Sequence, residues 1–92
     1  DGGDTWQGSY TALQNRGADM VRLMNALKVD AMTAHWEFTY GEDRVQALIK
    51  QLEFPFLAGN VKESTWGDPV LKPYQVFERG GLRIGVIGQA FP

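Results

Sequence analysis

The sequence predicts an α/β fold, built in the order loop, helix, strand, helix, strand and hairpin. Two segments repeat apolar residues at helical spacing, and each is followed by a short apolar run typical of a buried strand. A Gly-Gly pair then divides two strand-like runs near the end of the chain. Because strand and helix alternate, we expect the two buried strands to be parallel and joined by a right-handed crossover.

The first half of the chain contains a loop, a helix and a strand. Residues 1–9 are rich in glycine and predict a loop. Residues 29–34 are few and mostly apolar, which predicts a buried strand. Between them a helix is expected over 16–27, where apolar residues recur at i, i+3, i+4 and i+7: Met20, Leu23, Met24 and Leu27.

A second helix and strand follow. Thr39 and Glu42 have the spacing of a capping box, which predicts a helix start near residue 40. Residues 54–58 predict the next strand. The helix is expected over 40–52 because the same apolar spacing returns there: Val45, Leu48, Ile49 and Leu52.

The last third predicts a loop and a hairpin. Residues 59–73 form the loop, with Gly67, Pro69 and Pro73 as breaks. Runs 74–79 and 82–87 predict two strands that turn at Gly80-Gly81. No repeat or linker divides the chain. Because both ends cut through motifs that predict regular structure, residues 1–92 are expected to be an internal fragment of a longer protein, without an internal domain boundary.

Composition excludes several classes of function. The chain has 92 residues and a net charge of -2, so no basic surface for nucleic acid is implied. No apolar run approaches the roughly 20 residues of a membrane span. Cysteine is absent, which excludes disulfides, thiolate metal clusters and a cysteine nucleophile within this stretch. His35 is the one histidine, so no histidine pair can bind a metal.

Two loops should meet at the carboxyl edge of the predicted sheet, where α/β proteins gather their functional groups: 2–9 and 35–41. In the first loop, Asp4 lies among glycines that let the backbone approach a ligand. Its carboxylate could bind a hard or borderline cation. The alternative is that Asp4 caps a turn and the glycines serve only the bend.

The second loop offers an imidazole and a carboxylate, His35 and Glu37, which are good ligands for manganese, iron or zinc. The alternatives are a hydrogen-bonded structural histidine and a loop-capping glutamate. Trp36 lies between them and could pack or face a substrate. Asn60 follows the second strand and could reach the same edge or only form a turn. Ser9 has no nearby histidine, so a Ser-His-Asp triad is not supported.

These loops resemble sequence blocks of the calcineurin-like metallophosphoesterases, in particular the 5′-nucleotidase branch. Residues 3–9, Gly-Asp-Thr-Trp-Gln-Gly-Ser, match its Gly-Asp-x-x-x-Gly-Ser/Thr block, and 34–38 correspond to its Gly-Asn-His-Glu-Phe block. Three strings further resemble the SoxB subfamily of sulfur-oxidation enzymes: Asp-Gly-Gly-Asp-Thr-Trp at 1–6, His-Trp-Glu-Phe-Thr-Tyr-Gly at 35–41 and Ile-Gly-Gln-Ala-Phe-Pro at 87–92.

The resemblance implies a partial αββα sandwich within an N-terminal catalytic domain, with a pair of metal ions at the strand ends. It makes Asp4 the ligand that bridges both metals, and it puts His35 where the family has an asparagine ligand. Trp36 takes the place of the family's catalytic histidine, so no catalytic residue is assigned. Glu37 is expected to support the ligands rather than bind metal, and Asn60 to support them or contact substrate.

The resemblance also implies the activity. SoxB enzymes are periplasmic, bind two Mn²⁺ and release sulfate from a cysteine S-thiosulfonate on the carrier SoxYZ. The remaining metal ligands would lie outside residues 1–92, so the chain alone is expected to bind manganese weakly and to be inactive. Two alternatives stay open: a 5′-nucleotidase-type phosphoesterase, and a non-catalytic α/β binding module in which Asp4 and His35 are structural.

Overall fold

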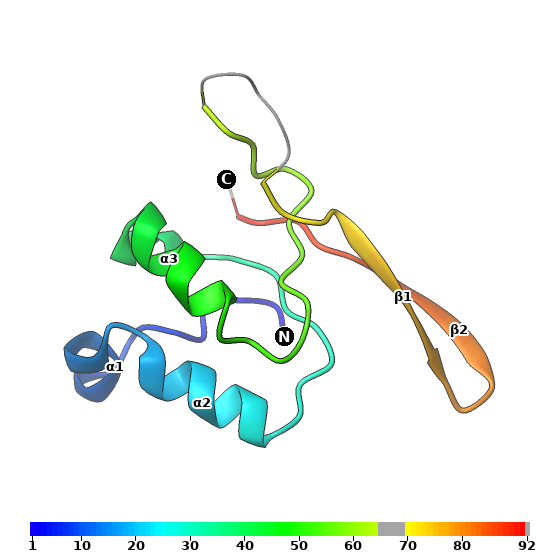
Figure 1. The fold of residues 1–92 in the computed structure, drawn as a ribbon, viewed down its shortest axis with the longest axis horizontal. Coiled ribbons are helices and arrows are strands. Elements are labelled where there is room, and N and C mark those ends of the chain that lie inside the picture. The colour runs from blue at the N-terminus through cyan, green and yellow to red at the C-terminus, as the bar shows by residue number, and fades with distance from the viewer. Residues whose placement is uncertain (65–69, 92) are drawn as a thin grey trace.

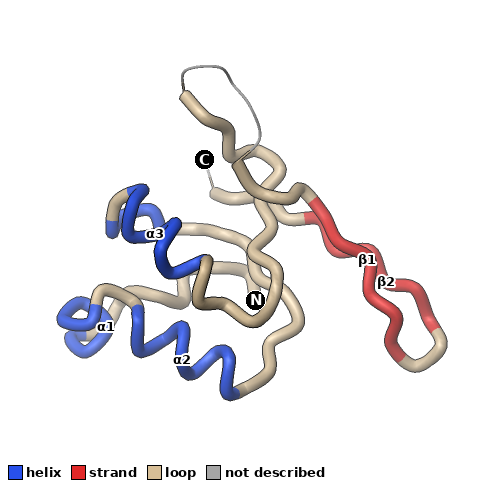
Figure 2. Tube along the Cα trace, in the orientation of Figure 1, coloured by secondary structure: helices blue, strands red, loops and turns tan. Residues whose placement is uncertain are grey.

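The computed structural model describes residues 1–64 and 70–91. Three helices, α1 (Tyr10–Asn15), α2 (Ala18–Ala26) and α3 (Glu42–Ile49), lie together on one side of the molecule. A hairpin of β1 (Tyr74–Arg79) and β2 (Leu82–Ile87) projects away from them (Figure 1). Between these parts the chain runs mainly as loops (Figure 2). The predicted α/β class is confirmed.

The first helix, α1, was missed by the sequence analysis. Ser9 caps it in an extended conformation, and its hydroxyl oxygen accepts a hydrogen bond from the Ala12 amide at 3.0 Å. The helix ends at Arg16, which is left-handed with φ 50°, and Gly17 continues the turn with φ 83°. Ala12 is the one buried residue of α1, so the sequence shows no apolar stripe that would predict this helix.

The helix predicted over 16–27 is α2, which is shorter and turned differently from the predicted stripe. Its buried residues are Val21 and Met24. Leu23 and Leu27 are 54% and 78% exposed, so these two members of the stripe were assigned to the core wrongly. The helix begins only after the left-handed Gly17, and that turn fixes which face meets the core.

The two segments predicted as strands, 29–34 and 54–58, are buried but do not form a regular ladder. They meet at one parallel bridge, between Met32 and Phe56, and Leu57 makes a further isolated bridge with Lys72. Pro55 has no N–H to donate, which prevents the ladder from extending at that point. The parallel direction is confirmed, and the prediction of full strands is wrong.

Helix α3 confirms the second predicted helix over a shorter span. Val45 and Leu48 are buried. The predicted capping box is wrong, because a 3₁₀ helix, η1 (Glu37–Tyr40), precedes α3 and Gly41 occupies the N-cap. The Thr39 hydroxyl instead donates to the Trp36 carbonyl at 2.8 Å.

The predicted hairpin is confirmed in register and turn. Tyr74 pairs with Ile87 at the open end and Arg79 with Leu82 at the turn. Gly80 and Gly81 both have positive φ, of 58° and 77°, which is the backbone that a tight two-residue turn requires. Of the predicted loop over 59–73, residues 65–69, with Gly67 and Pro69, lie outside the described residues.

The core lies between the helices and the buried loop segments. Trp6 is fully buried, and its ring packs against Phe56 with centroids 5.4 Å apart. The Tyr40 hydroxyl donates to the Trp6 carbonyl at 2.7 Å, and burial, with a smaller contribution from Asp19, raises the pKa of Tyr40 above 10.0. The first loop is therefore anchored to the core directly beyond Asp4.

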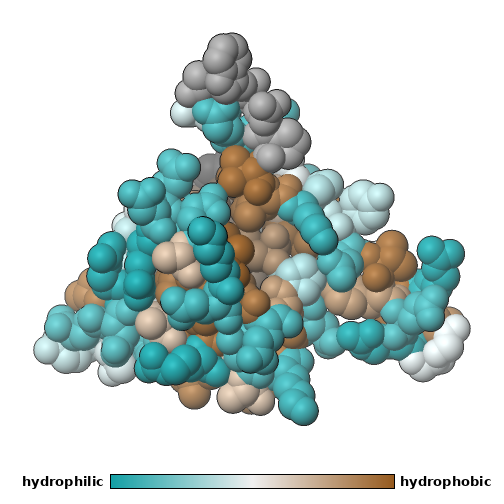
Figure 3. Space-filling view, viewed as in Figure 1, coloured by the Kyte–Doolittle hydropathy of each residue, from teal (hydrophilic) through white to brown (hydrophobic). Residues whose placement is uncertain are grey.

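The surface is mostly hydrophilic over the helices. Figure 3 shows hydrophobic residues at the centre of the view and on the hairpin. Tyr74, Leu82 and Ile87 of the hairpin are 59%, 67% and 75% exposed. None of the described helices is long and apolar enough to cross a membrane.

Candidate metal centre

The two predicted functional loops lie side by side. The amino group of Asp1 donates to the Ala31 carbonyl at 2.8 Å, and the Thr33 amide donates to the Asp1 carbonyl at 3.0 Å. A hydrogen bond from the Phe91 amide to the Ala34 carbonyl, at 3.3 Å, adds a third segment. The Thr5 amide donates to Oε1 of Glu37 at 2.7 Å, so loops 2–9 and 35–41 are in contact, although the described residues form no regular parallel sheet beside them.

Asp4 and His35 face each other across this edge. The Nδ1 atom of His35 lies 3.7 Å from Oδ1 of Asp4. Asp4 has a left-handed backbone, with φ 64°, and its carboxylate accepts a hydrogen bond from the Gln7 side chain. The side chains of His35 and Asp4 are 32% and 53% exposed, although the Nδ1 atom of His35 itself is buried.

The buried side chain of Glu37 joins the two loops. It is the one buried charged side chain among the described residues, with no exposed surface. Oε1 of Glu37 accepts a hydrogen bond from the Thr5 amide at 2.7 Å, and Oε2 accepts one from the His35 amide at 2.6 Å. Both oxygens are thus used to hold the backbones next to Asp4 and His35. Glu37 thus acts as a brace between the two loops.

The donors at this edge fit part of a metal site. His35 Nδ1 is buried and has no hydrogen-bond partner in the described part of the chain, which is unusual for a polar atom. An unpartnered imidazole nitrogen beside a carboxylate is a donor pair that suits a borderline divalent cation. No group of three or more His, Cys, Asp and Glu side chains that could hold an ion is found in residues 1–64 and 70–91. Asp4 and His35 therefore supply two donors, and a complete site needs more.

Trp36 is half exposed, at 52%. It lines a pocket of about 300 Å³ together with four neighbours: His35, Phe38, Thr39 and Phe91. His35 is the single titratable group in this lining, so the pocket beside the candidate metal donors is largely aromatic. The indole has no group able to exchange a proton near neutral pH.

Asn60 reaches the same edge but does not face the pocket. Its side-chain amide donates to the Ala90 carbonyl at 2.7 Å and its side-chain oxygen accepts from the Ala90 amide at 2.8 Å. Both polar atoms are thereby occupied by one backbone unit. Asn60 supports the segment that carries Phe91. The string at 87–92 stood out in the sequence, but no local pattern indicated a role for Phe91. Pro92 lies outside the described residues.

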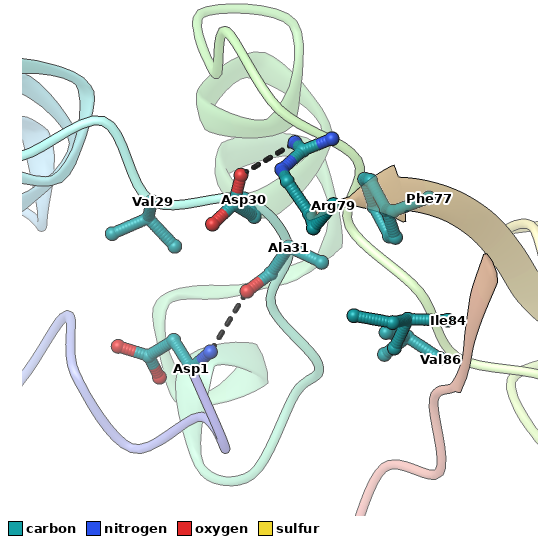
Figure 4. A pocket seen from close by; sticks show the side chains of 8 residues that line it. All are labelled: Asp1, Val29, Asp30, Ala31, Phe77, Arg79, Ile84 and Val86. Carbon is teal, nitrogen blue, oxygen red and sulfur yellow. Dashed lines mark hydrogen bonds and ion pairs between the residues drawn. The ribbon is translucent and has the colours of Figure 1, made fainter. Parts of the chain in front are cut away.

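A second cavity, of about 450 Å³, lies between the hairpin and residues 29–31 (Figure 4). Val29, Phe77, Ile84 and Val86 supply its apolar side chains. Arg79 and Asp30 form an ion pair at its rim, at 2.7 Å, with both side chains more than half exposed. Neither Asp4 nor His35 lines it, so this cavity is separate from the metal donors.

Gly3 makes the close approach of the loops possible. A Cβ at this position would lie 2.7 Å from the His35 amide nitrogen and 2.9 Å from the Thr33 carbonyl oxygen, and φ is +87°. Gly3→Ala is therefore expected to destabilise the fold by about 2–4 kcal/mol, from left-handed strain plus displaced backbone. Gly8 also has a positive φ, of 100°, but nothing lies within 4 Å of its Cβ position.

Gly8→Ala is thus a matched control, expected to cost only about 1–2 kcal/mol from backbone strain. Urea unfolding of both variants of the full-length gene product measures the difference. Equal costs for the two glycines would contradict the close contact between Gly3 and the His35 loop.

Comparison with curated proteins finds 5′-nucleotidases among the relatives of this chain. No protein family model matches the chain. The human 5′-nucleotidase is 33% identical over 94 residues, which cover 96% of this chain and 16% of the human protein. The chain thus spans about a sixth of the length of this relative.

Comparison with solved structures extends the similarity to the fold. A structure of the sulfate thiohydrolase SoxB of Thermus thermophilus has a TM-score of 0.93 and 38% identity, covering 100% of this chain and 17% of that one. The calcineurin-like phosphoesterase YfkN of Bacillus subtilis has a TM-score of 0.79 and 30% identity, covering 98% of this chain and 33% of that one. Sequence and fold therefore agree over nearly the whole chain.

Proposed function

Because this chain belongs to the 5′-nucleotidase/calcineurin-like superfamily, as its motifs predicted, we propose that it is part of the catalytic domain of a dimetal hydrolase. The superfamily is dimetal-dependent. We further propose that the substrate is a cysteine S-thiosulfonate on the carrier SoxYZ, that the metals are two Mn²⁺ and that the enzyme works in the periplasm. The similarity to SoxB over the full length of the chain supports this reading.

The observation that carries the proposal is Trp36. It stands where the superfamily's block has the histidine that serves as proton donor, and an indole cannot donate a catalytic proton. An alkoxide that leaves from a nucleotide is strongly basic and benefits from such a donor. A sulfur leaving group is far less basic, since a thiol has a pKa of about 8.5, so it can leave without one. Trp36 therefore favours a sulfur substrate.

The proposed reaction is a hydrolysis at the terminal sulfur. The oxygen of a water molecule bonds to the sulfonate sulfur, and the bond between that sulfur and the next one breaks. The electron pair of that bond stays on the carrier, which becomes a persulfide, and the water protons are released or taken up by the persulfide. When bound, a metal pair supplies an activated water near neutral pH and neutralises negative charge on the substrate oxygens.

The residues of this chain have separate tasks in that reaction. Asp4 and His35 would hold the metals, as the buried, unpartnered His35 Nδ1 and the neighbouring carboxylate allow. Glu37 keeps the two loops at a fixed separation. Trp36 and its aromatic neighbours line the open pocket beside His35. The exposed edge leaves room for a protein-bound substrate to enter.

A nucleotide phosphoesterase is the second candidate, favoured by the 33% identity to human 5′-nucleotidase. The two candidates separate in one assay. The full-length gene product is made metal-free and supplied with Mn²⁺. Sulfate is then measured from thiosulfonate-loaded SoxYZ and phosphate from AMP. We expect manganese-dependent sulfate release and at least about 100-fold slower release of phosphate.

Unloaded carrier and metal-free enzyme serve as controls. Phosphate release at a rate comparable with sulfate release would favour the nucleotidase. Failure of both reactions in folded, metal-loaded protein would leave the non-catalytic binding module. The 92-residue chain, assayed in parallel, is expected to release no sulfate, because residues 1–64 and 70–91 hold no group of three or more side chains that could bind a metal ion. Turnover by this chain would contradict that expectation.

A further inference from the structure

The ring of Phe91 stacks on the imidazole of His35. The two centroids lie 4.6 Å apart with an angle of 28° between the rings. Trp36 lies near both rings, 6.1 Å from His35 and 6.2 Å from Phe91. Phe91 is 55% exposed, so one part of it covers the imidazole while the rest borders the aromatic pocket.

The segment that carries Phe91 is fixed at several points. Asn60 holds Ala90 by two hydrogen bonds, and Ala90 is buried at 5% exposure. The Gly59 amide donates to the Gly88 carbonyl at 2.9 Å. Gly88 allows the close approach, because a Cβ there would lie 2.2 Å from the Leu57 carbonyl oxygen. Phe91 therefore has a defined place relative to His35.

This stack takes over a task that a hydrogen bond usually performs. A metal-binding histidine is normally oriented by a hydrogen bond from its second ring nitrogen to a carboxylate or carbonyl. No hydrogen bond to either nitrogen of His35 is present within the described ranges, although its backbone amide is bound to Glu37. Glu37 thus fixes the backbone of His35, and the ring is left to be oriented by its stacking partner.

We propose that Phe91 is the positioning residue for the His35 imidazole, and that Asn60 acts through Ala90 to hold Phe91 in place. The proposal rests on the proposed function, because it takes His35 to be a metal ligand. The stack keeps the ring plane fixed so that Nδ1 faces Asp4. Loss of the stack would let the imidazole rotate and would weaken metal binding. Binding would not be abolished, because the other donors would still hold the metal.

The test is the dissociation constant for Mn²⁺ of the metal-free, full-length gene product. Phe91→Leu keeps an apolar side chain and removes the ring. It is expected to raise the dissociation constant about two- to tenfold, which matches the free energy that an aromatic pair usually contributes. Phe91→Tyr keeps the ring and is expected to stay within twofold of wild type. Phe77→Leu, the same change in the hairpin, is the matched control and should have no effect.

Asn60→Ala is expected to weaken manganese binding in the same direction as Phe91→Leu. Because both act through one segment, the double variant should lose no more than the larger single effect. Three results would each overturn the positioning role alone. They are an unchanged dissociation constant in folded Phe91→Leu, an equal loss of manganese affinity in Phe77→Leu or Phe91→Tyr, and fully additive losses of affinity in the double variant. Wild-type protein that binds no Mn²⁺ would overturn the proposed function as well, so the two failures are distinguishable.

Discussion

Asp4→Ala and His35→Ala are each expected to abolish manganese-dependent sulfate release, with kcat falling about a thousandfold or more. The reason is that both donors lie at one edge, 3.7 Å apart. Removal of either donor weakens a metal site that would stabilise the charge of the transition state by several kcal/mol. Manganese affinity should fall in parallel. Both quantities are measured on the full-length gene product, beside wild type.

The matched control for Asp4 is Asp43→Ala, which removes an equal charge from the exposed start of α3. It is expected to change kcat and manganese affinity by less than twofold, since this exposed carboxylate belongs to the first turn of α3 and not to the loops that carry Asp4 and His35. Melting temperatures of all variants show whether they are folded. Full activity in folded Asp4→Ala or His35→Ala would remove these residues from the metal site and with them the basis of the proposed mechanism.

Glu37→Ala is expected to have the second-largest effect, on the fold and on metal affinity together. The substitution leaves the half-buried amides of Thr5 and His35 without acceptors, at about 1–3 kcal/mol each, so the free energy of unfolding should fall by about 2–6 kcal/mol. Because the same bonds fix the backbones beside Asp4 and His35, manganese affinity should drop about 10- to 100-fold.

Two further variants separate bracing from general stability. Glu37→Gln keeps one acceptor oxygen and replaces the other with an N–H donor that faces an amide. It should therefore restore only part of the manganese affinity that Glu37→Ala loses. Glu42→Ala, at an exposed position at the start of α3, should change the free energy of unfolding by less than about 0.5 kcal/mol. Manganese affinity is titrated at low temperature, where every variant is folded. Wild-type affinity in Glu37→Ala would show that the brace does not reach the metal donors.

The sequence by itself determined the local elements and the chemistry of the edge. The Gly80-Gly81 turn specified a hairpin because few other residues adopt that backbone, and its strands were predicted to the residue. Val45 and Leu48 identified α3 since their spacing matches one helical face. The glycine-bounded Asp4 and the His35–Glu37 pair pointed to one functional edge, and the motif resemblance identified the superfamily.

Only the tertiary structure decided how these elements are used. The left-handed turn at Arg16 and Gly17 set which face of α2 is buried, and periodicity alone could not show that Leu23 lies outside the core. Pro55 lacks the N–H that would extend the pairing on one side of the Met32–Phe56 bridge. The tasks of Glu37, Asn60 and Phe91 depend on contacts between residues 30 or more positions apart. Such contacts are set by how the loops pack against the core, which no local pattern in the sequence encodes.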